Sequence, residues 1–329
     1  MGVKNWQKLV PWQWVNISDL YVPKIAIDAP NYLMRRISHV RIRRSSRVPL
    51  THMHLAFGLI RQALKHHILP VLIFDGPPET LKRQPNPQLI TTAQMLYERF
   101  LLKQDVYDSK IADSLYEYPA VRLYFAANHI RDLCRAAGVP AVTAPSEAEM
   151  YGAVLCRDGF VGTVVSNDAD TLLFGSPHVT KNLQLSKGMM ECATLSELER
   201  VLDLDVELLR DLAIVCGCDF HRTGVKGLGP RKGVLELKRY GGLPYLLRAR
   251  GLTPSEREEY IKAREVFNEP SYLSANGVNL TLKPPITTRL EKMLQLFAGK
   301  EGAEKKTKEI VRLWKVFGKT QSTLESFVS

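Results

Sequence analysis

The stretch that decides the fold is KIAIDA, residues 24–29, together with the two segments that follow it, HLAFGLIRQALKHH at 54–67 and VLIFDGPPE at 71–79. The first and the third begin as apolar runs that reach an acid, which is typical of buried strands, and the middle segment has helical periodicity. Apolar strands that alternate with helices predict a parallel sheet covered by helices on both faces.

The same alternation continues along the chain. We expect a helix over 129–138, a strand within 138–144, a helix over 146–159, a strand at 162–166 and mainly helices from about residue 195. Ser146 is the expected N-cap of the helix over 146–159, and Glu149 three residues later gives the spacing of a capping box. The predicted fold class is therefore α/β, with a central, mostly parallel sheet flanked by helices.

Carboxylates gather in five short segments, and four of these segments follow an apolar run. The acids are Asp28, Asp75, Glu147, Glu149, Asp168, Asp170 and Asp219. Ligand sites in open α/β sheets lie beyond the carboxyl ends of the strands, where several of these acids fall. No matching set of His or Cys accompanies them, so hard oxygen ligands for Mg²⁺ or Mn²⁺ are indicated. Two such ions are the usual apparatus for cutting phosphodiester bonds.

Each acidic segment also has a plain structural interpretation. Acids stabilise the first turn of a helix through its dipole, which explains Glu147 and Glu149, and loops are rich in Asp, which explains Asp168 and Asp170. The co-occurrence of all five segments, in an order that a parallel sheet would bring together, favours the metal site.

The charge of the chain points to a polyanionic partner. Lys and Arg number 45 against 34 Asp and Glu, so the formal net charge is +11 despite the acidic segments. The run MRRISHVRIRRSSR at 34–47 follows the first strand and its acid, and we expect it to track a phosphate backbone. The alternative is a solvated loop, which is what many charge runs are.

The segment GVKGLGPRKGVLELKRYGG, residues 224–242, predicts a backbone clamp for duplex DNA. Its glycines, including Gly227 and Gly229, permit a tight hairpin whose N–H groups face outward. Pro230 suits the first turn of the helix that follows. Lys226, Arg231 and Lys232 add positive charge, so the segment is interpreted as a helix-hairpin-helix type of DNA-binding region that holds phosphates without reading bases. An ordinary glycine-rich helix connection is the alternative.

Other classes are excluded by composition. No apolar run is long enough for a membrane span, and the N-terminus lacks an apolar signal-peptide core, so we expect no membrane association. The five cysteines show no zinc-binding pattern and are expected to be reduced in an intracellular protein.

Taken together, IDA, FDGPPE, PSEAE, DADTLLFG and GCDF followed by GVKGLGP resemble the flap endonucleases of the XPG-type structure-specific nuclease family, in particular its archaeal members. The resemblance covers nearly the whole chain and implies a PIN-like 5′ nuclease fold with a helical arch. It implies metal-ligand roles for all seven acids, two Mg²⁺ ions per active site that Mn²⁺ can replace, a catalytic role for Lys82 and DNA contacts for Arg41 and Arg61.

The resemblance also implies a partner for the C-terminal tail. QSTLESFV, residues 321–328, is similar to the family's motif for binding the sliding clamp PCNA. Gln321 would anchor it, and Leu324 and Phe327 would enter an apolar pocket from a short helical turn. A disordered terminus is the alternative.

Two positions depart from the family's pattern. The family supplies a catalytic arginine seven residues after the lysine, where this chain has Leu89, and an aromatic residue where it has Met34. Arg83 is the expected substitute, because its guanidinium can grip a phosphate bidentately. Arg99 and Lys103, four apart on a predicted helix, could line the same face further along.

The resemblance yields a single nuclease domain over 1–318 and a flexible clamp-binding tail over 319–329. Its expected parts are an N-terminal nuclease part to about 82, an arch over 83–127, an internal nuclease part with the hairpin over 128–255, and a C-terminal helical part over 256–318. The expected protein is a monomeric, Mg²⁺-dependent 5′ flap endonuclease of the archaeal cytoplasm, associated with the nucleoid. It would act on branched DNA in Okazaki-fragment maturation and base-excision repair. The alternatives are a clamp-tethered junction binder with weak activity, or a 5′–3′ exonuclease or gap endonuclease of the same family.

Overall fold

The computed structural model describes residues 3, 5–34, 37, 47–77 and 86–328. The chain divides into two compact units, each made of three segments. The first contains Met1–Asp28, Asp75–Arg83 and Ala144–Val278, and the second contains Ala29–Phe74, Gln84–Thr143 and Asn279–Ser329.

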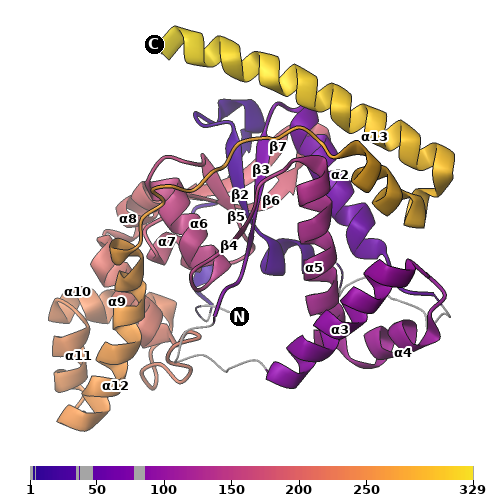
Figure 1. The fold of residues 1–329 in the computed structure, drawn as a ribbon. Helices are drawn as coiled ribbons and strands as arrows, with labels where there is room; N and C mark the ends of the chain where they lie inside the picture. Colours follow the sequence, from indigo (N-terminus) through magenta and orange to yellow (C-terminus); the bar gives the residue numbers. More distant parts are fainter. Residues whose placement is uncertain (1–2, 4, 35–36, 38–46, 78–85, 329) are drawn as a thin grey trace. The chain divides into compact units, whose positions relative to one another are not determined.

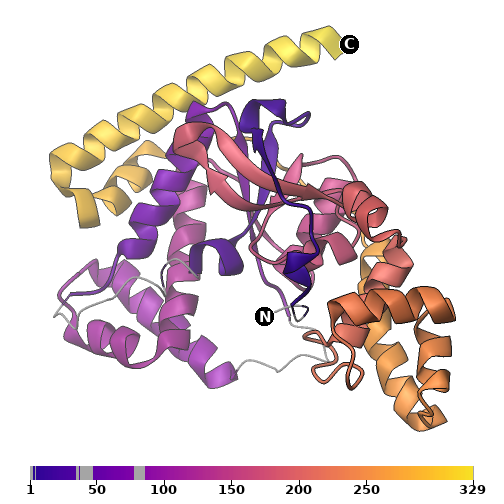
Figure 2. The same ribbon diagram turned by 180° about the vertical axis from the view of Figure 1, so that it is seen from behind.

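The first unit is built on five strands in the order β1-β7-β6-β5-β2. They are β1 (Gln13–Asn16), β2 (Lys24–Asp28), β5 (Thr163–Val165), β6 (His178–Gln184) and β7 (Met189–Thr194). Strand β5 runs parallel to both β2 and β6, with Ile25 opposite Thr163, whereas β7 is antiparallel to β6 and β1. The apolar runs at 24–28 and 162–166 therefore form parallel strands, as predicted, and Figure 2 shows the β6–β7 hairpin that was not predicted.

Helices pack on this sheet and continue beyond it (Figure 1). They are α6 (Ala148–Arg157), α7 (Asp170–Leu173), α8 (Leu195–Leu202), α9 (Val206–Cys216), α10 (Pro230–Tyr240), α11 (Leu243–Ala249) and α12 (Pro254–Glu265). Helix α6 packs against β2 and β5, and α9 packs against α10, α11 and α12. Short turns η1 (Trp6–Lys8), η2 (Ile17–Asp19), η4 (Leu185–Lys187) and η5 (Val266–Tyr272) complete the unit. One continuous apolar core contains residues from Val3 to Phe267.

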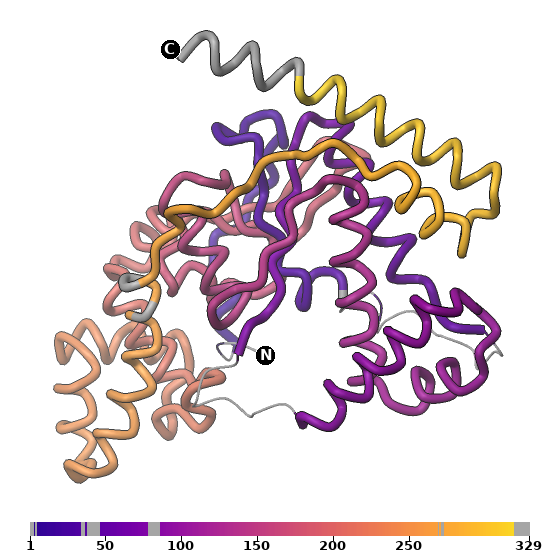
Figure 3. The backbone as a smooth tube through the Cα atoms, viewed as in Figure 1, coloured from indigo at the N-terminus to yellow at the C-terminus, as the bar shows by residue number. Residues whose placement is uncertain are grey.

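The second unit pairs two parallel strands with long helices (Figure 3). Its elements are η3 (Pro30–Met34), α2 (Thr51–Lys65), β3 (Leu69–Phe74), α3 (Pro87–Lys103), α4 (Ser109–Glu117), α5 (Pro119–Ala137), β4 (Ala141–Thr143) and α13 (Thr287–Val328), which bends at Gly299. Strand β3 is buried along its length, as its apolar sequence predicts, and packs against α2. The fold class is confirmed, because mostly parallel strands are flanked by helices.

The described part of the segment predicted as an arch is helical, and it shares a small core with α5 and Val48. Tyr97 and Phe100 of α3, Ile111 and Leu115 of α4, and Phe125 of α5 are buried together. Leu89, where the resemblance predicts an arginine, packs against this cluster and is partly buried. An apolar residue therefore has a structural role here, because it helps hold α3 on α5.

None of the helices in the described residues combines the length and the apolar character that crossing a membrane requires.

All five cysteines are free. Burial raises the pKa of the Cys134 and Cys216 thiols to about 12 and the pKa of the Cys192 and Cys218 thiols to about 11. Thiols of such high pKa are poor nucleophiles, which agrees with a structural role.

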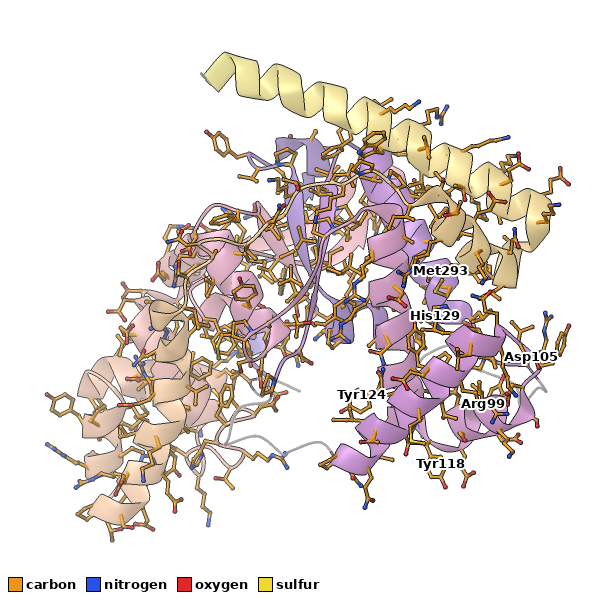
Figure 4. The ribbon with its side chains drawn as sticks, in the orientation of Figure 1. Arg99, Asp105, Tyr118, Tyr124, His129 and Met293 are labelled. Atoms are coloured by element: carbon orange, nitrogen blue, oxygen red, sulfur yellow. The ribbon has the colours of Figure 1, made fainter. Side chains whose placement is uncertain are left out.

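A buried histidine pair, His52 and His129, lies beside the small core of α3, α4 and α5, and Figure 4 labels His129 on α5. His52 Nε2 lies 3.0 Å from His129 Nδ1, and both rings are almost fully buried. Beside them, the Tyr97 hydroxyl donates to Asp132 at 2.6 Å, and Asp132 also pairs with Arg135 and Arg289. Burial lowers the pKa of His129 to about 4 and lowers the pKa of His52 as well.

Because His129 is buried and neutral, we expect the free energy of unfolding to fall in mild acid. The native state holds His129 neutral, whereas an unfolded histidine takes up a proton near pH 6.5, so its stabilisation is complete above that pH and is lost as the pH falls toward 4. We expect His129 to contribute a loss of about 2 kcal/mol in unfolding free energy between pH 7.5 and pH 5. Urea titrations followed by circular dichroism should show a flatter pH dependence in His129→Gln than in the parent. His66→Gln, which removes a half-buried histidine of the same unit, should leave the parental profile, and an equally steep profile in His129→Gln would contradict the assignment.

Candidate metal and nucleic-acid site

All seven predicted acids lie in the first unit and in its described residues. Asp28 ends β2, and Asp168 lies three residues beyond the end of the parallel neighbour β5. Because the carboxyl ends of parallel strands meet at one edge, these two acids belong to the same edge of the sheet. Asp170 begins α7, and Asp219 follows α9. These acids therefore lie at or shortly after strand ends and helix ends or starts, and their role as metal ligands stays a prediction.

Asp168 and Asp170 are close neighbours, and the charge of Asp219 also acts on Asp168. The Asp170 backbone N–H donates to Asp168 Oδ1 at 3.2 Å, and the side-chain amide of Gln7 lies 3.5 Å from the same oxygen. Burial raises the pKa of Asp168, and the nearby Asp219 raises it further. Burial, followed by the charge of Asp168, raises the pKa of Asp170 well above its usual value. Carboxylates crowded in this way favour a cation between them.

Asp75, Glu147 and Glu149 form a second acidic group at the start of α6. The Ala148 N–H donates to Asp75 Oδ1 at 2.9 Å, and the Gly76 N–H donates to the Ser146 carbonyl at 2.6 Å. A side chain at Gly76 would meet the Ala144 carbonyl oxygen at 2.1 Å, so only glycine permits this approach. The segment at 75–76 is thereby fixed against the start of α6.

The predicted capping box at this helix is wrong. The N-cap of α6 is Glu147, not Ser146, and its side chain makes no capping hydrogen bond. Asp75, 73 residues earlier, accepts the free N–H of Ala148 instead. A carboxylate distant in the sequence has therefore replaced the local cap.

The donor chemistry of these acids suits Mg²⁺, since carboxylate oxygens are its usual protein ligands. Within the described part of the chain, no group of three or more His, Cys, Asp or Glu side chains is arranged so that it could hold a metal ion as it stands. The acids thus form two groups of the expected chemistry, and the full metal site stays a prediction.

Two residues that sequence reasoning missed contact Asp170. The indole N–H of Trp6 donates to Asp170 Oδ1 at 3.0 Å, and the Val3 backbone N–H lies 3.2 and 3.0 Å from the two carboxylate oxygens. The sequence separation exceeds 160 residues, so no local pattern marks these contacts. Only the need of a buried indole for an acceptor hints at them.

At the glycine-rich segment, the structure agrees with the prediction that Pro230 stands in the first turn of a helix. Helix α10 begins at Pro230, and Gly227 has φ +80°, a conformation that glycine adopts without strain. A groove of about 540 Å³ opens here, lined by Asn5, Lys8, Leu9, Gly227, Gly229, Pro230, Arg231 and Lys232. Lys226, Arg231 and Lys232 are exposed, which leaves their charges available to a backbone phosphate.

The remaining predicted residues have varied outcomes. Arg61 Nη1 lies 3.7 Å from Glu309 Oε2, so this predicted DNA contact forms an ion pair within the chain. Arg99 Nε and Lys103 Nζ, both on α3, lie 2.7 and 3.9 Å from Asp108 Oδ2, so their charges are paired with this acid at the N-cap of α4. Arg41, Lys82 and Arg83 lie outside the described residues, as do the side chains of Gln321, Leu324 and Phe327.

Two family models match the segments of the chain that contain the acids. The XPG N-terminal domain model matches residues 1–91, which contain Asp28 and Asp75, and the XPG I-region model matches residues 138–219, which contain the other acids. The chain is 30% identical over 261 residues to the Flap endonuclease 1 of Pyrococcus abyssi, covering 72% of this chain and 74% of that protein.

Solved structures show the same fold. The structure of flap endonuclease-1 from Methanococcus jannaschii matches with a TM-score of 0.71 and 27% identity, covering 94% of this chain and 98% of that one. A second structure, of the Holliday junction-resolving enzyme GEN1 in complex with product DNA and a Mg²⁺ ion, matches with a TM-score of 0.60 and 17% identity, covering 95% of this chain and 78% of that one. The second likeness concerns the fold alone.

Proposed function

Because this chain belongs to the XPG family, with the flap endonucleases as its relatives, we propose that it is a divalent-metal-dependent 5′ flap endonuclease that cuts branched DNA near the base of the flap. The observation that carries this proposal is the set of seven acids in one unit, among which Asp168 lies beside Asp170 and Asp219 is near enough for its charge to raise the pKa of Asp168. Crowded negative charge is costly in a protein that binds phosphates, unless a cation joins it.

Different residues of the chain would bind the metal ions, the duplex and the scissile phosphate. The acids at the sheet edge and at the start of α6 would hold two Mg²⁺ ions. When bound, such ions activate water and stabilise negative charge on the phosphate. The hairpin holds duplex DNA by its backbone through Lys226, Arg231 and Lys232. Lys82 would place positive charge at the scissile phosphate, and Arg83 would supply the second cation that Leu89 does not.

A cleavage assay tests the proposal directly. A labelled double-flap DNA, a blunt duplex and a single strand should be incubated with the protein in Mg²⁺, in Mn²⁺ and in EDTA. We expect cutting of the double flap near the flap base and no cutting in EDTA. Binding of the flap without any cutting would favour the alternative of a junction binder, whereas release of mononucleotides from nicked or gapped DNA would favour an exonuclease or gap endonuclease.

The junction binder is disfavoured by the acids themselves. A protein that only binds DNA gains nothing from buried carboxylates next to phosphates, and Asp28, Glu147 and Asp170 are all buried in the first unit. Desolvating a carboxylate that serves no ligand costs free energy. Their retention at positions of low exposure therefore supports catalysis.

The wider cellular setting is a further part of the proposal. The chain would act in Okazaki-fragment maturation and base-excision repair, as a monomer, in the nucleoid region of an archaeal cytoplasm. The archaeal flap endonucleases among its relatives support this setting. The clamp PCNA would be its partner through residues 321–328.

The C-terminal tail predicts a separable clamp function. The backbone of α13 continues to Val328, and positions 321, 324 and 327, three apart, fall on one side of such a helix. Deleting residues 321–329 should leave cleavage of free flap DNA unchanged and abolish stimulation by PCNA. Calorimetry should show the loss of clamp binding, and Ser322→Ala, next to the motif positions, serves as the control that keeps it. Unchanged clamp affinity in the deletion variant would rule out this tail as the binding segment.

A further inference from the structure

A tryptophan in the N-terminal segment is bonded to one of the candidate metal ligands. Trp6 lies in the short turn η1 and is fully buried. Its indole N–H donates to Asp170 Oδ1 at 3.0 Å, while the Val3 N–H approaches both oxygens of the same carboxylate. The carboxylate therefore has donors on the side that faces the N-terminal segment.

The surroundings of Trp6 make this contact rigid. The ring belongs to the continuous core of the first unit, together with residues of α7 such as Leu172 and Leu173. A buried ring in a close-packed core has a single position, so its N–H is aimed at one place. Asp170 itself begins α7 and is buried, which leaves its side chain little freedom.

The chemical type of the donor matters. A lysine or arginine could also fix a buried carboxylate, but its positive charge would oppose a cation bound to the same group. An indole N–H and a backbone N–H are neutral, so they orient the carboxylate without adding charge that repels a cation. A hydrogen-bond donor that contacts a metal ligand, without binding the metal itself, fixes the orientation of that ligand. The loss of such a donor typically weakens metal affinity about 10–100-fold.

We propose that Trp6 is a positioning residue, which holds the Asp170 carboxylate in one orientation for a divalent cation through its indole N–H. The inference rests on the proposed function, because it takes Asp170 as a ligand. It makes the N-terminal turn part of the metal site, although the turn contributes no acid of its own.

The test is a metal-binding titration without DNA. Mn²⁺ alone is titrated into the parent, Trp6→Phe, Trp12→Phe and Asp170→Asn, and bound ion is followed by electron paramagnetic resonance. Phe keeps most of the apolar ring but has no N–H, so Trp6→Phe should bind Mn²⁺ about 10–100-fold more weakly. Trp12, a half-buried tryptophan of the same unit that packs beside the core, is the matched control and should keep the parental affinity.

The outcomes separate the inference from the proposed function. Weakened binding in both Asp170→Asn and Trp6→Phe supports the positioning role. Parental affinity in Trp6→Phe, with weakened binding in Asp170→Asn, overturns the positioning role and leaves Trp6 as a core residue only. Parental affinity in Asp170→Asn, or no Mn²⁺ binding in the parent, overturns the metal assignment itself.

A second measurement keeps the inference testable if Trp6→Phe does not fold. In ¹⁵N-labelled protein with Trp12, Trp14 and Trp314 replaced by Phe, the one remaining indole N–H signal belongs to Trp6. Adding Mg²⁺ should shift this signal in a saturable way and slow its exchange with solvent. A signal that is indifferent to Mg²⁺ would overturn the proposal.

Discussion

Replacing Asp168 by Asn is expected to reduce flap cleavage by at least about a thousandfold, which is several kcal/mol of transition-state stabilisation. Asn is nearly the same shape, and its side-chain oxygen can still accept from the Asp170 N–H and from Gln7. The variant therefore loses a negative ligand while its local hydrogen bonds persist. Single-turnover cleavage of a double-flap DNA in Mg²⁺ is the measurement.

Binding should move in the opposite direction. In Ca²⁺, which allows binding to be measured without turnover, Asp168→Asn should bind flap DNA as tightly as the parent or more tightly, because a buried negative charge near phosphates has been removed. Its thermal midpoint without metal should not fall, since the charge of Asp168 no longer acts on Asp170. Asp19→Asn, at an exposed acid of the same unit, controls for the charge change and should cleave normally. Turnover near the parental level in Asp168→Asn would remove this acid from the metal site.

The parts of the fold that sequence predicts well are the continuous apolar strands. KIAID forms β2, VLIF lies within β3 and TVV forms β5, because each run is buried on both faces and needs no alternation to be recognised. Strands β6 and β7 were missed for the opposite reason. Their buried positions alternate irregularly with partly buried or exposed ones, and the register shifts between Thr180 and Asn182, so neither the helical nor the strand period stands out.

The site was predicted as a set of residues but not as a set of contacts. The acids are local to strand ends and helix starts, so their elements could be predicted from short segments. Their partners could not, because Trp6 reaches Asp170 and Ala148 reaches Asp75 across long stretches of chain. Arg99 shows the same limit: the helix face was predicted, but its charge is paired with Asp108, which lies at the N-cap of the next helix of the arch.

The second large expected effect concerns the salt dependence of DNA binding by the glycine-rich hairpin. Lys226, Arg231 and Lys232 are exposed, and Arg231 and Lys232 line the groove that opens at Gly227 and Gly229. Each side chain that neutralises a phosphate releases counterions, which sets how steeply affinity falls with salt. Replacing all three by Ala should reduce that slope by about 0.9 log units per log salt for each phosphate that is no longer neutralised, or about 2.7 in total.

The weakening should not depend on base sequence, because backbone contacts position a protein without reading bases. Binding of two flap DNAs of unrelated sequence, in Ca²⁺ and at several salt concentrations, measures both properties. A variant with Ala at Lys187, Arg200 and Lys262, three exposed cations elsewhere in the same unit, removes the same charge and so matches any long-range effect. We expect it to keep nearly the parental slope. If the slope falls equally in the two triple variants, net charge and not the hairpin holds the duplex, and if the hairpin variant weakens one sequence far more than the other, its side chains contact bases.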